Sequence, residues 1–183
     1  MKIPNQYKSL EYVHDIEWSD IFSVWRAYEA YQACWREHWI ERGFDSWDEW
    51  RNNYILPLSP ESKEWKIYKI KDLKMIGEFY GVPSRGWIKK CYNGEITKKL
   101  GDILDHPMIK DNKKIDAIMK NSPYQTMLTG IVNDGKIVLV EGMHRVCALA
   151  LMAKDDVKYS GDIVIALAEH KGEISKIGKG SNN

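Results

Sequence analysis

The sequence predicts an α+β fold, in which helices pack on a small mixed sheet. Apolar runs on both sides of Asn133-Asp134-Gly135 indicate a β-hairpin, because these residues tolerate the positive φ of a tight turn. The apolar stretch 146–153 that follows has the length of a helix. The nearly continuous apolar run 162–168 is typical of a buried central strand. Ahead of these elements, Trp and Tyr recur at helical spacing.

The composition narrows the class of protein. The chain has 183 residues, with 27 basic and 26 acidic side chains. This nearly balanced charge gives no overall electrostatic reason to expect a nucleic-acid partner, although it leaves open a local basic patch. Three cysteines without C-x-x-C spacing favour a reduced, intracellular protein over a disulfide scaffold. No leader-like or membrane-length apolar segment is present. We therefore expect a cytoplasmic protein that does not enter a membrane.

The first part of the chain predicts a Trp-rich helical hairpin. Residues 1–17 are polar and mixed, which indicates an irregular lead-in. Apolar residues at steps of three, four and seven then predict one long helix from Trp18 to Arg42. A capping box that starts at Ser46 predicts a short second helix to about Tyr54. The aromatic side chains could form a wall that stacks on a flat ligand, but we favour their packing as core against the rest of the chain.

Two prolines within residues 56–60 mark the predicted boundary, because proline stops a helix. We expect a helical extension at 1–58, a mixed-sheet domain at 59–172 and a Gly-, Ser- and Asn-rich flexible tail at 173–183. Within the domain, the pattern predicts a strand at 65–70 and helices at 71–80, 95–104 and 112–120. The small basic turn Ser84-Arg85-Gly86 could close over a phosphate.

The chemistry concentrates at the end of the predicted hairpin. Gly142 can adopt backbone angles closed to other residues and leaves the following amides open to a ligand. Met143, His144 and Arg145 then fall on the first turn of a helix, where unpaired N–H groups and the helix dipole favour an anion. The sequence therefore predicts a phosphate-binding cradle, with a helix end that is merely capped and solvated as the alternative.

Segment 141–149, Glu-Gly-Met-His-Arg-Val-Cys-Ala-Leu, resembles the G-x-H-R-x-x-A signature of the ParB/sulfiredoxin superfamily. This superfamily includes nucleotide-dependent free serine kinases. Residues 112–121 and 162–168 resemble the helix before its hairpin and the strand that closes its sheet. The resemblance covers roughly residues 64–170 and implies a ParB/sulfiredoxin-like fold that binds ATP or another nucleoside triphosphate.

The resemblance also implies phosphate ligands outside the signature. In sulfiredoxin-like relatives the helix before the hairpin presents a Lys, a Ser and a Thr to the nucleotide, and these align with Lys110, Lys113 and Ala117. Two hydroxyls are therefore absent and one cation is added. Lys110 and Lys113 could serve as point charges for phosphates, or they could be exposed helix residues.

The residues in and beside the signature indicate which activities of the superfamily to expect in this chain. Sulfiredoxins use a Cys where this chain has Met143, so sulfinic-acid reduction is not expected. CTP-binding ParB proteins carry basic residues where this chain has His144 and Cys147, so a segregation-type ParB is not expected either. Free serine kinases place an acid where Glu141 stands, which could accept a proton or hold Mg²⁺. The alternative for Glu141 is a structural pair with Arg145.

The first functional hypothesis is a phosphotransferase or nucleotide hydrolase that acts on a small hydroxyl compound, with Glu141 and His144 as the catalytic candidates. Gly142, Met143 and Arg145 would bind the nucleotide with His144, and Glu141 would bind the metal. The second hypothesis is a non-catalytic nucleotide sensor or nucleic-acid-associated module. The third is a decayed site with an aromatic hairpin that mediates protein association.

Overall fold

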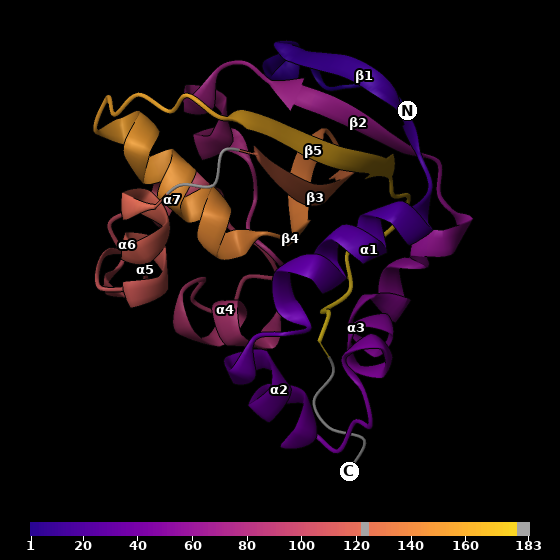
Figure 1. Cartoon of the computed structure of the whole chain (residues 1–183). Helices are drawn as coiled ribbons and strands as arrows, with labels where there is room; N and C mark the ends of the chain where they lie inside the picture. The colour runs from indigo at the N-terminus through magenta and orange to yellow at the C-terminus, as the bar shows by residue number, and fades with distance from the viewer. Residues whose placement is uncertain (122–124, 179–183) are drawn as a thin grey trace.

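The computed structural model describes residues 1–121 and 125–178 of the chain, and it confirms the α+β class with a mixed sheet. The five strands lie side by side in the order β1, β2, β5, β3, β4 (Figure 1). Only the β3–β5 pair is parallel. In chain order the strands are β1 (Leu10–Ile16), β2 (Trp65–Ile70), β3 (Gln125–Asn133), β4 (Lys136–Glu141) and β5 (Asp162–Glu169).

The helices form two groups that flank the sheet. Figure 1 shows α5 and α6 beside α7 on one side of the molecule, and α1, α2 and α3 on the other. The α-helices are α1 (Trp18–Glu29), α2 (Ala33–Ile40), α3 (Trp47–Ile55), α4 (Arg85–Lys90), α5 (Pro107–Lys110), α6 (Lys113–Lys120) and α7 (Met143–Lys154). Short 3₁₀ helices lie at Asn5–Tyr7, Leu56–Leu58, Pro60–Ser62, Leu73–Glu78 and Leu100–Asp102. Among the described residues, no helix is both long enough and apolar enough to cross a bilayer.

Several local predictions are confirmed. Asp134 and Gly135 take φ angles of 45° and 75° in the turn between β3 and β4, as the hairpin prediction required. The strand β5 lies between β2 and β3, so its apolar residues are covered by both neighbours and by the core. The side chain of Asn112 accepts hydrogen bonds from the backbone N–H groups of Lys114 and Ile115, which fixes the start of α6.

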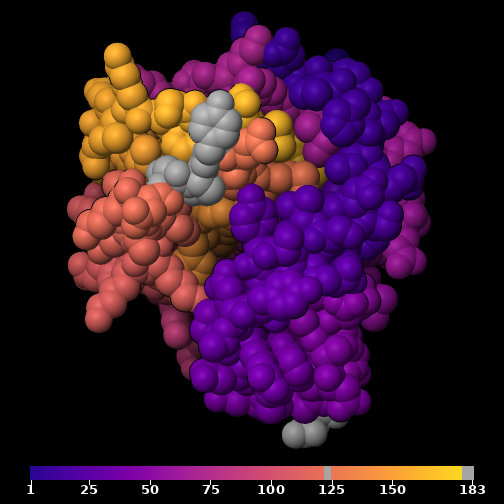
Figure 2. All heavy atoms as spheres, viewed as in Figure 1, coloured from indigo at the N-terminus to yellow at the C-terminus, as the bar shows by residue number. Residues whose placement is uncertain are grey.

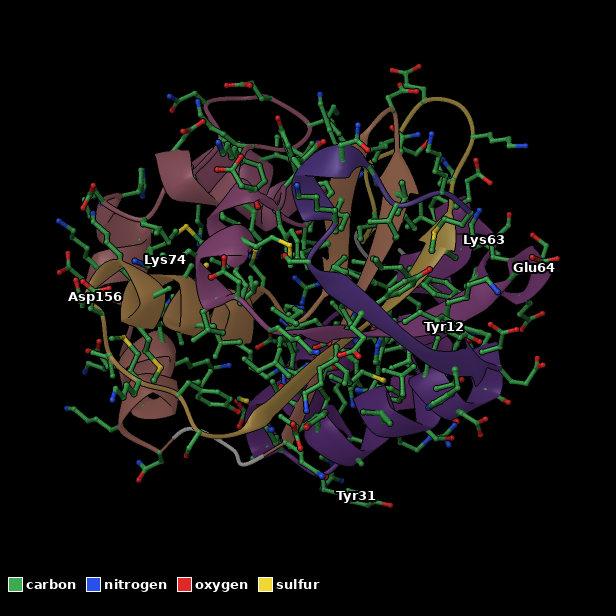
Figure 3. All side chains as sticks on the ribbon, turned by 90° about the horizontal axis from the view of Figure 1, so that it is seen from above. Tyr12, Tyr31, Lys63, Glu64, Lys74 and Asp156 are labelled. Atoms are coloured by element: carbon green, nitrogen blue, oxygen red, sulfur yellow. The ribbon has the colours of Figure 1, made fainter. Side chains whose placement is uncertain are left out.

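The predictions for the first 42 residues were wrong in two places. Residues 10–16 are not an irregular lead-in but form β1, an edge strand that pairs antiparallel with β2. The long helix expected from Trp18 to Arg42 is two helices, separated where Gln32 adopts an extended backbone. The exposed Tyr31 lies at this break (Figure 3). The break allows α2 to pack on α3, where the Trp35 and Trp50 ring centroids are 5.6 Å apart.

The helices predicted at 71–80 and 95–104 were also wrong in extent. Only the 3₁₀ segments Leu73–Glu78 and Leu100–Asp102 form there. Backbone hydrogen bonds between the two segments explain the difference, because Gly81 N–H donates to Lys98 and Leu100 N–H donates to Phe79. These long-range bonds satisfy the backbone in extended form, so tertiary pairing overrides the helical pattern.

The hydrophobic core is continuous across the predicted boundary at residue 58. Trp18, Trp25 and Trp47 of the N-terminal helices are buried in the same cluster as the residues of the sheet. Trp25 is fully buried, and its indole N–H donates to Thr129 Oγ1 on β3 at 2.9 Å. The preference for aromatic packing is therefore confirmed for these three side chains. The sheet itself draws β1 from the N-terminal region.

The predicted flexible tail at 173–183 is described as far as Gly178, and residues 179–183 lie outside the described part of the chain. Within the described part, Ile177 is fully buried and its backbone N–H donates to the carbonyl of Pro83. The N–H of Gly178 donates to the carbonyl of Tyr54. These residues are therefore packed between the two helical groups.

We expect Trp25→Ala to lower the free energy of unfolding by about 3–5 kcal/mol, the usual cost of truncating a buried aromatic side chain. Tyr31→Ala is the matched control, because Tyr31 is 89% exposed at the α1–α2 break, and it should change stability by less than ~0.5 kcal/mol. Equilibrium denaturation of both variants measures this. Equal effects of the two substitutions would contradict the core assignment of Trp25.

Candidate functional site

Gly142 joins β4 to α7 in a conformation that only glycine adopts without strain. Its φ is 93° and its ψ is 17°, and a Cβ placed there would lie 2.7 Å from a methyl carbon of Leu128. The helix begins at Met143, as the sequence predicted, and no side chain caps it. The first N–H groups of α7 consequently lack intrahelical partners at this end.

This helix end opens into a pocket of about 710 Å³ between the two groups of helices. One wall comes from α1, α2 and α3, and the opposite wall comes from residues 82–90, α5 and α6. Residues 140–145 complete the lining. Figure 2 shows the molecule hollowed between the indigo and purple N-terminal helices and the salmon segment that contains α5 and α6. Nine of the 25 residues that line the pocket therefore precede the predicted sheet domain.

Aromatic rings cover much of the pocket wall. Trp35 and Trp50 face each other at 5.6 Å, and Trp87 meets the His144 ring edge-on at 5.7 Å. Tyr28, His38 and Tyr54 add further rings. Tyr28, Trp35, His38 and Tyr54 are partly exposed there, as the ligand-wall interpretation requires, whereas Trp50 and Trp87 line the pocket but also belong to the buried core. The sequence could not distinguish the pocket-lining Trp35 and Trp50 from the core residues Trp18, Trp25 and Trp47, because all of them recur at helical spacing.

A buried ion pair joins α1 to α3 at one side of the pocket. Arg51 Nε donates to Glu29 Oε2 at 2.6 Å, and Arg51 Nη2 donates to Glu29 Oε1. The guanidinium also lies over the rings of Trp50 and Tyr54, 4.5 and 4.6 Å from their centroids. Burial alone would lower the pKa of Arg51, but its attraction to Glu29 and their hydrogen bonds outweigh burial and raise it. No sequence signal pointed to this pair, because its members lie on separate helices.

A second buried ion pair joins β4 to α7. Arg145 Nη2 lies 2.7 and 2.6 Å from the two carboxylate oxygens of Glu141, and Nη1 donates to Thr126 Oγ1 at 3.3 Å. The guanidinium also stacks 4.2 Å from the ring centroid of Tyr28. Burial raises the pKa of the Glu141 carboxyl, and the charge of Arg145 opposes this shift. Of the two alternatives for Glu141, the structure contains the pair with Arg145, and Arg145 would bind a phosphate only while sharing its charge with Glu141.

His144 lines the pocket as a neutral ring. Burial, assisted by the nearby charge of Lys114, lowers the pKa of His144 to about 4. His38 is displaced in the same direction, because burial and then the charges of Arg42 and Arg51 lower its pKa. The predicted ligand Met143 is buried, and its sulfur lies 3.9 Å from the hydroxyl of Tyr92, so only its backbone is placed to meet an anion.

The two lysines taken from the resemblance do not line the pocket. Lys110 is exposed and forms an ion pair with Asp105 at 2.8 Å, and Lys113 is exposed on α6. The next residue, Lys114, does line the pocket, with its Nζ 4.7 Å from the ring centroid of Trp35. Neighbouring residues on a helix point about 100° apart around its axis. The gapless alignment therefore selected Lys113, one residue before the side chain that faces the pocket.

The pocket carries a surplus of positive charge. Six cationic side chains and two carboxylates line it, and both carboxylates are bound to arginines. The four remaining cations have no carboxylate within 4.0 Å among residues 1–121 and 125–178, and these are Arg42, Arg85, Lys90 and Lys114. Residues 84–86, predicted as a flexible basic turn, are instead the start of α4, and they line the pocket. An anion that carries several charges would therefore find a favourable potential here.

The two carboxylates of the pocket are poorly placed to bind Mg²⁺. Magnesium prefers carboxylate oxygens in octahedral geometry, but Glu29 and Glu141 each face a guanidinium at hydrogen-bond distance. The part of the chain that the structure describes contains no group of three or more His, Cys, Asp and Glu side chains arranged to hold a metal. These residues do not fit a divalent cation at Glu141. The rings and cations do fit a nucleotide.

Comparison with models of known protein families, with curated proteins and with solved structures finds no match. The ParB/sulfiredoxin-like resemblance therefore stays a prediction.

We expect Arg145→Met to destabilise the fold by about 3–5 kcal/mol, because it leaves the buried Glu141 carboxylate without its partner. The double variant Glu141→Gln/Arg145→Met removes both charges and should recover about 1–3 kcal/mol of that loss. Equilibrium denaturation of the two single variants and the double variant measures the coupling. Strictly additive effects would show that the pair does not hold β4 to α7.

Proposed function

We propose that the protein binds a nucleotide in the pocket between the N-terminal helices and α7. One observation carries the proposal. Aromatic walls and four cations without carboxylate partners converge on the open end of α7. Flat rings stack on a base, while lysines, arginines and free helix N–H groups bind phosphates.

Each part of a nucleotide has a suitable part of the pocket. The rings of Trp35 and Trp87, which both line the pocket, would stack on the base. The first turn of α7 and Lys114 would meet the phosphates, with Arg85 approaching from the start of α4. A long nucleic acid suits this site less well, because the surplus charge lies in a cavity and the chain as a whole is nearly neutral.

We also propose that the fold is ParB/sulfiredoxin-like. Support comes from the order of elements around the signature, in which α6 precedes the β3–β4 hairpin and α7 and β5 follow it. The signature residue Gly142 stands at the strand-to-helix junction with the positive φ that the motif implies.

Of the two functional classes, a nucleotide-binding module without catalysis agrees better with the two ion pairs, because neither pocket carboxylate is free to act. A phosphotransferase or hydrolase remains the second candidate, and Glu141 favours it. This carboxylate lines the pocket, and burial raises its pKa against the opposing charge of Arg145, which makes it a stronger base than an exposed glutamate. The acceptor hydroxyl would give its proton to Glu141 while its oxygen bonds to the γ-phosphorus. The bond from that phosphorus to the bridging oxygen would break and release a nucleoside diphosphate.

Lys114→Ala should weaken nucleotide binding by more than about tenfold, or ~1.4 kcal/mol, because it removes a charge-assisted contact from the pocket. Lys113→Ala is the matched control, since this neighbour has the same charge on the same helix but does not line the pocket. Titration calorimetry with ATP, GTP and CTP measures both variants. Equal losses in the two variants, or no binding to the unaltered protein, would refute the proposed site.

If the protein is a phosphotransferase or hydrolase, Glu141→Gln should lower turnover by ~100-fold or more, the scale of losing a general base. The amide keeps the shape of the side chain and an oxygen that accepts from Arg145. Phosphate release and phosphoryl transfer to small hydroxyl compounds are the measurements, with a thermal melt to show that the variant folds. Unchanged turnover in the variant would exclude Glu141 as the base, and an inactive parent protein would favour the binding module.

A further inference from the structure

We infer that the pocket takes its ligand as a metal-free nucleoside polyphosphate, with the side chains of the protein replacing the divalent cation that usually accompanies such ligands. The inference rests on the proposed nucleotide binding and goes beyond it, because it names the ionic species that binds. Three features of the pocket support it: the state of its carboxylates, its count of charges and the position of its cations.

Both carboxylates of the pocket are already ion-paired with arginines. Proteins that bind a nucleotide with Mg²⁺ usually hold the metal through one or two carboxylates as well as the phosphates. Here Arg51 engages Glu29, and Arg145 engages Glu141 with 2.6 and 2.7 Å contacts to its two oxygens. A metal ion at either carboxylate would have to displace a buried guanidinium, which would then lose its only carboxylate partner. Breaking such a buried pair is unfavourable.

The charges of the pocket match a polyphosphate without metal. The lining has a surplus of four positive charges, since six cations face two carboxylates and the rings of His38 and His144 are neutral. A nucleoside triphosphate carries roughly four negative charges near pH 7, because its terminal phosphate is then nearly doubly ionised. Bound Mg²⁺ would cancel about half of that charge and so weaken the attraction to the pocket.

The four cations without a carboxylate partner line the cavity from several elements. Lys114 comes from α6, Arg42 follows α2, and Arg85 and Lys90 lie at the two ends of α4. A polyphosphate that bound among them would meet cations on several sides. A divalent cation carried on its oxygens would be repelled by the same side chains. Among the residues that the structure describes, both carboxylates that line the cavity are bound to arginines, so neither offsets this repulsion.

Titration calorimetry with ATP, GTP and CTP, each in EDTA and in saturating MgCl₂ at matched ionic strength, tests the inference. We expect affinity in EDTA to exceed affinity in MgCl₂ by at least about tenfold for any triphosphate that binds. AMP is the ligand control, because it binds magnesium weakly, and its affinity should change little between the buffers.

Charge reversal supplies the matched protein variants. Lys114→Glu should lower affinity in EDTA and reduce the ratio of the two affinities, because it places a free carboxylate in the pocket, whereas Lys113→Glu should preserve both values. Equal or tighter binding of triphosphate with MgCl₂ would overturn the inference and leave nucleotide binding intact. Absence of binding in both buffers would overturn nucleotide binding itself, and the inference with it.

Discussion

Two buried arginine–carboxylate pairs hold the pocket together. Glu29–Arg51 fastens α1 to α3, and Glu141–Arg145 fastens the end of β4 to the first turn of α7. Removing charges from water is costly, so such pairs persist only where geometry and further contacts compensate. Here each guanidinium also lies over aromatic rings, with Arg51 on Trp50 and Tyr54 and Arg145 on Tyr28. The positions of these aromatic rings and of the two arginines in the pocket therefore depend on each other.

The pairs also decide what kind of ligand the pocket favours. Arginines neutralise both carboxylates, so the charges of the four other cations are not cancelled by any carboxylate of the described lining. The lining is therefore strongly positive, although the chain carries a formal net charge of only +1. The aromatic rings supply a surface for a flat group, and the open end of α7 supplies backbone donors. This combination suits an anion that carries an aromatic ring.

The N-terminal helices belong to the core and to the pocket at once. One face of α1 presents Trp25 to the sheet, where the indole meets Thr129, while Glu29 and Tyr28 reach the pocket from the end of the same helix. The break after α1 then turns α2 so that Trp35 faces the cavity. The same helices thus pack on the sheet and line the proposed binding site. A substitution on the sheet-facing side can therefore shift the pocket-lining side through the shared backbone.

Elements whose signals lie within a few residues could be predicted from the sequence. The turn at Asp134-Gly135, the strand-to-helix junction at Gly142 and the apolar strand β5 follow from backbone chemistry and hydrophobic pattern within a few residues. Gly142 in particular was predictable, because its φ of 93° suits glycine and strains a residue with a Cβ.

Features that depend on contacts between distant segments could not be predicted from the sequence and are set by how those segments pack. It paired residues 10–16 with β2 as a strand, directed Lys114 rather than Lys113 into the cavity, and joined Arg145 to Glu141 instead of leaving both for a ligand. These outcomes depend on the rotation of a helix about its axis and on which groups meet when segments pack. Residue types and spacing along the chain state which side chains can interact, but only packing decides which of them do.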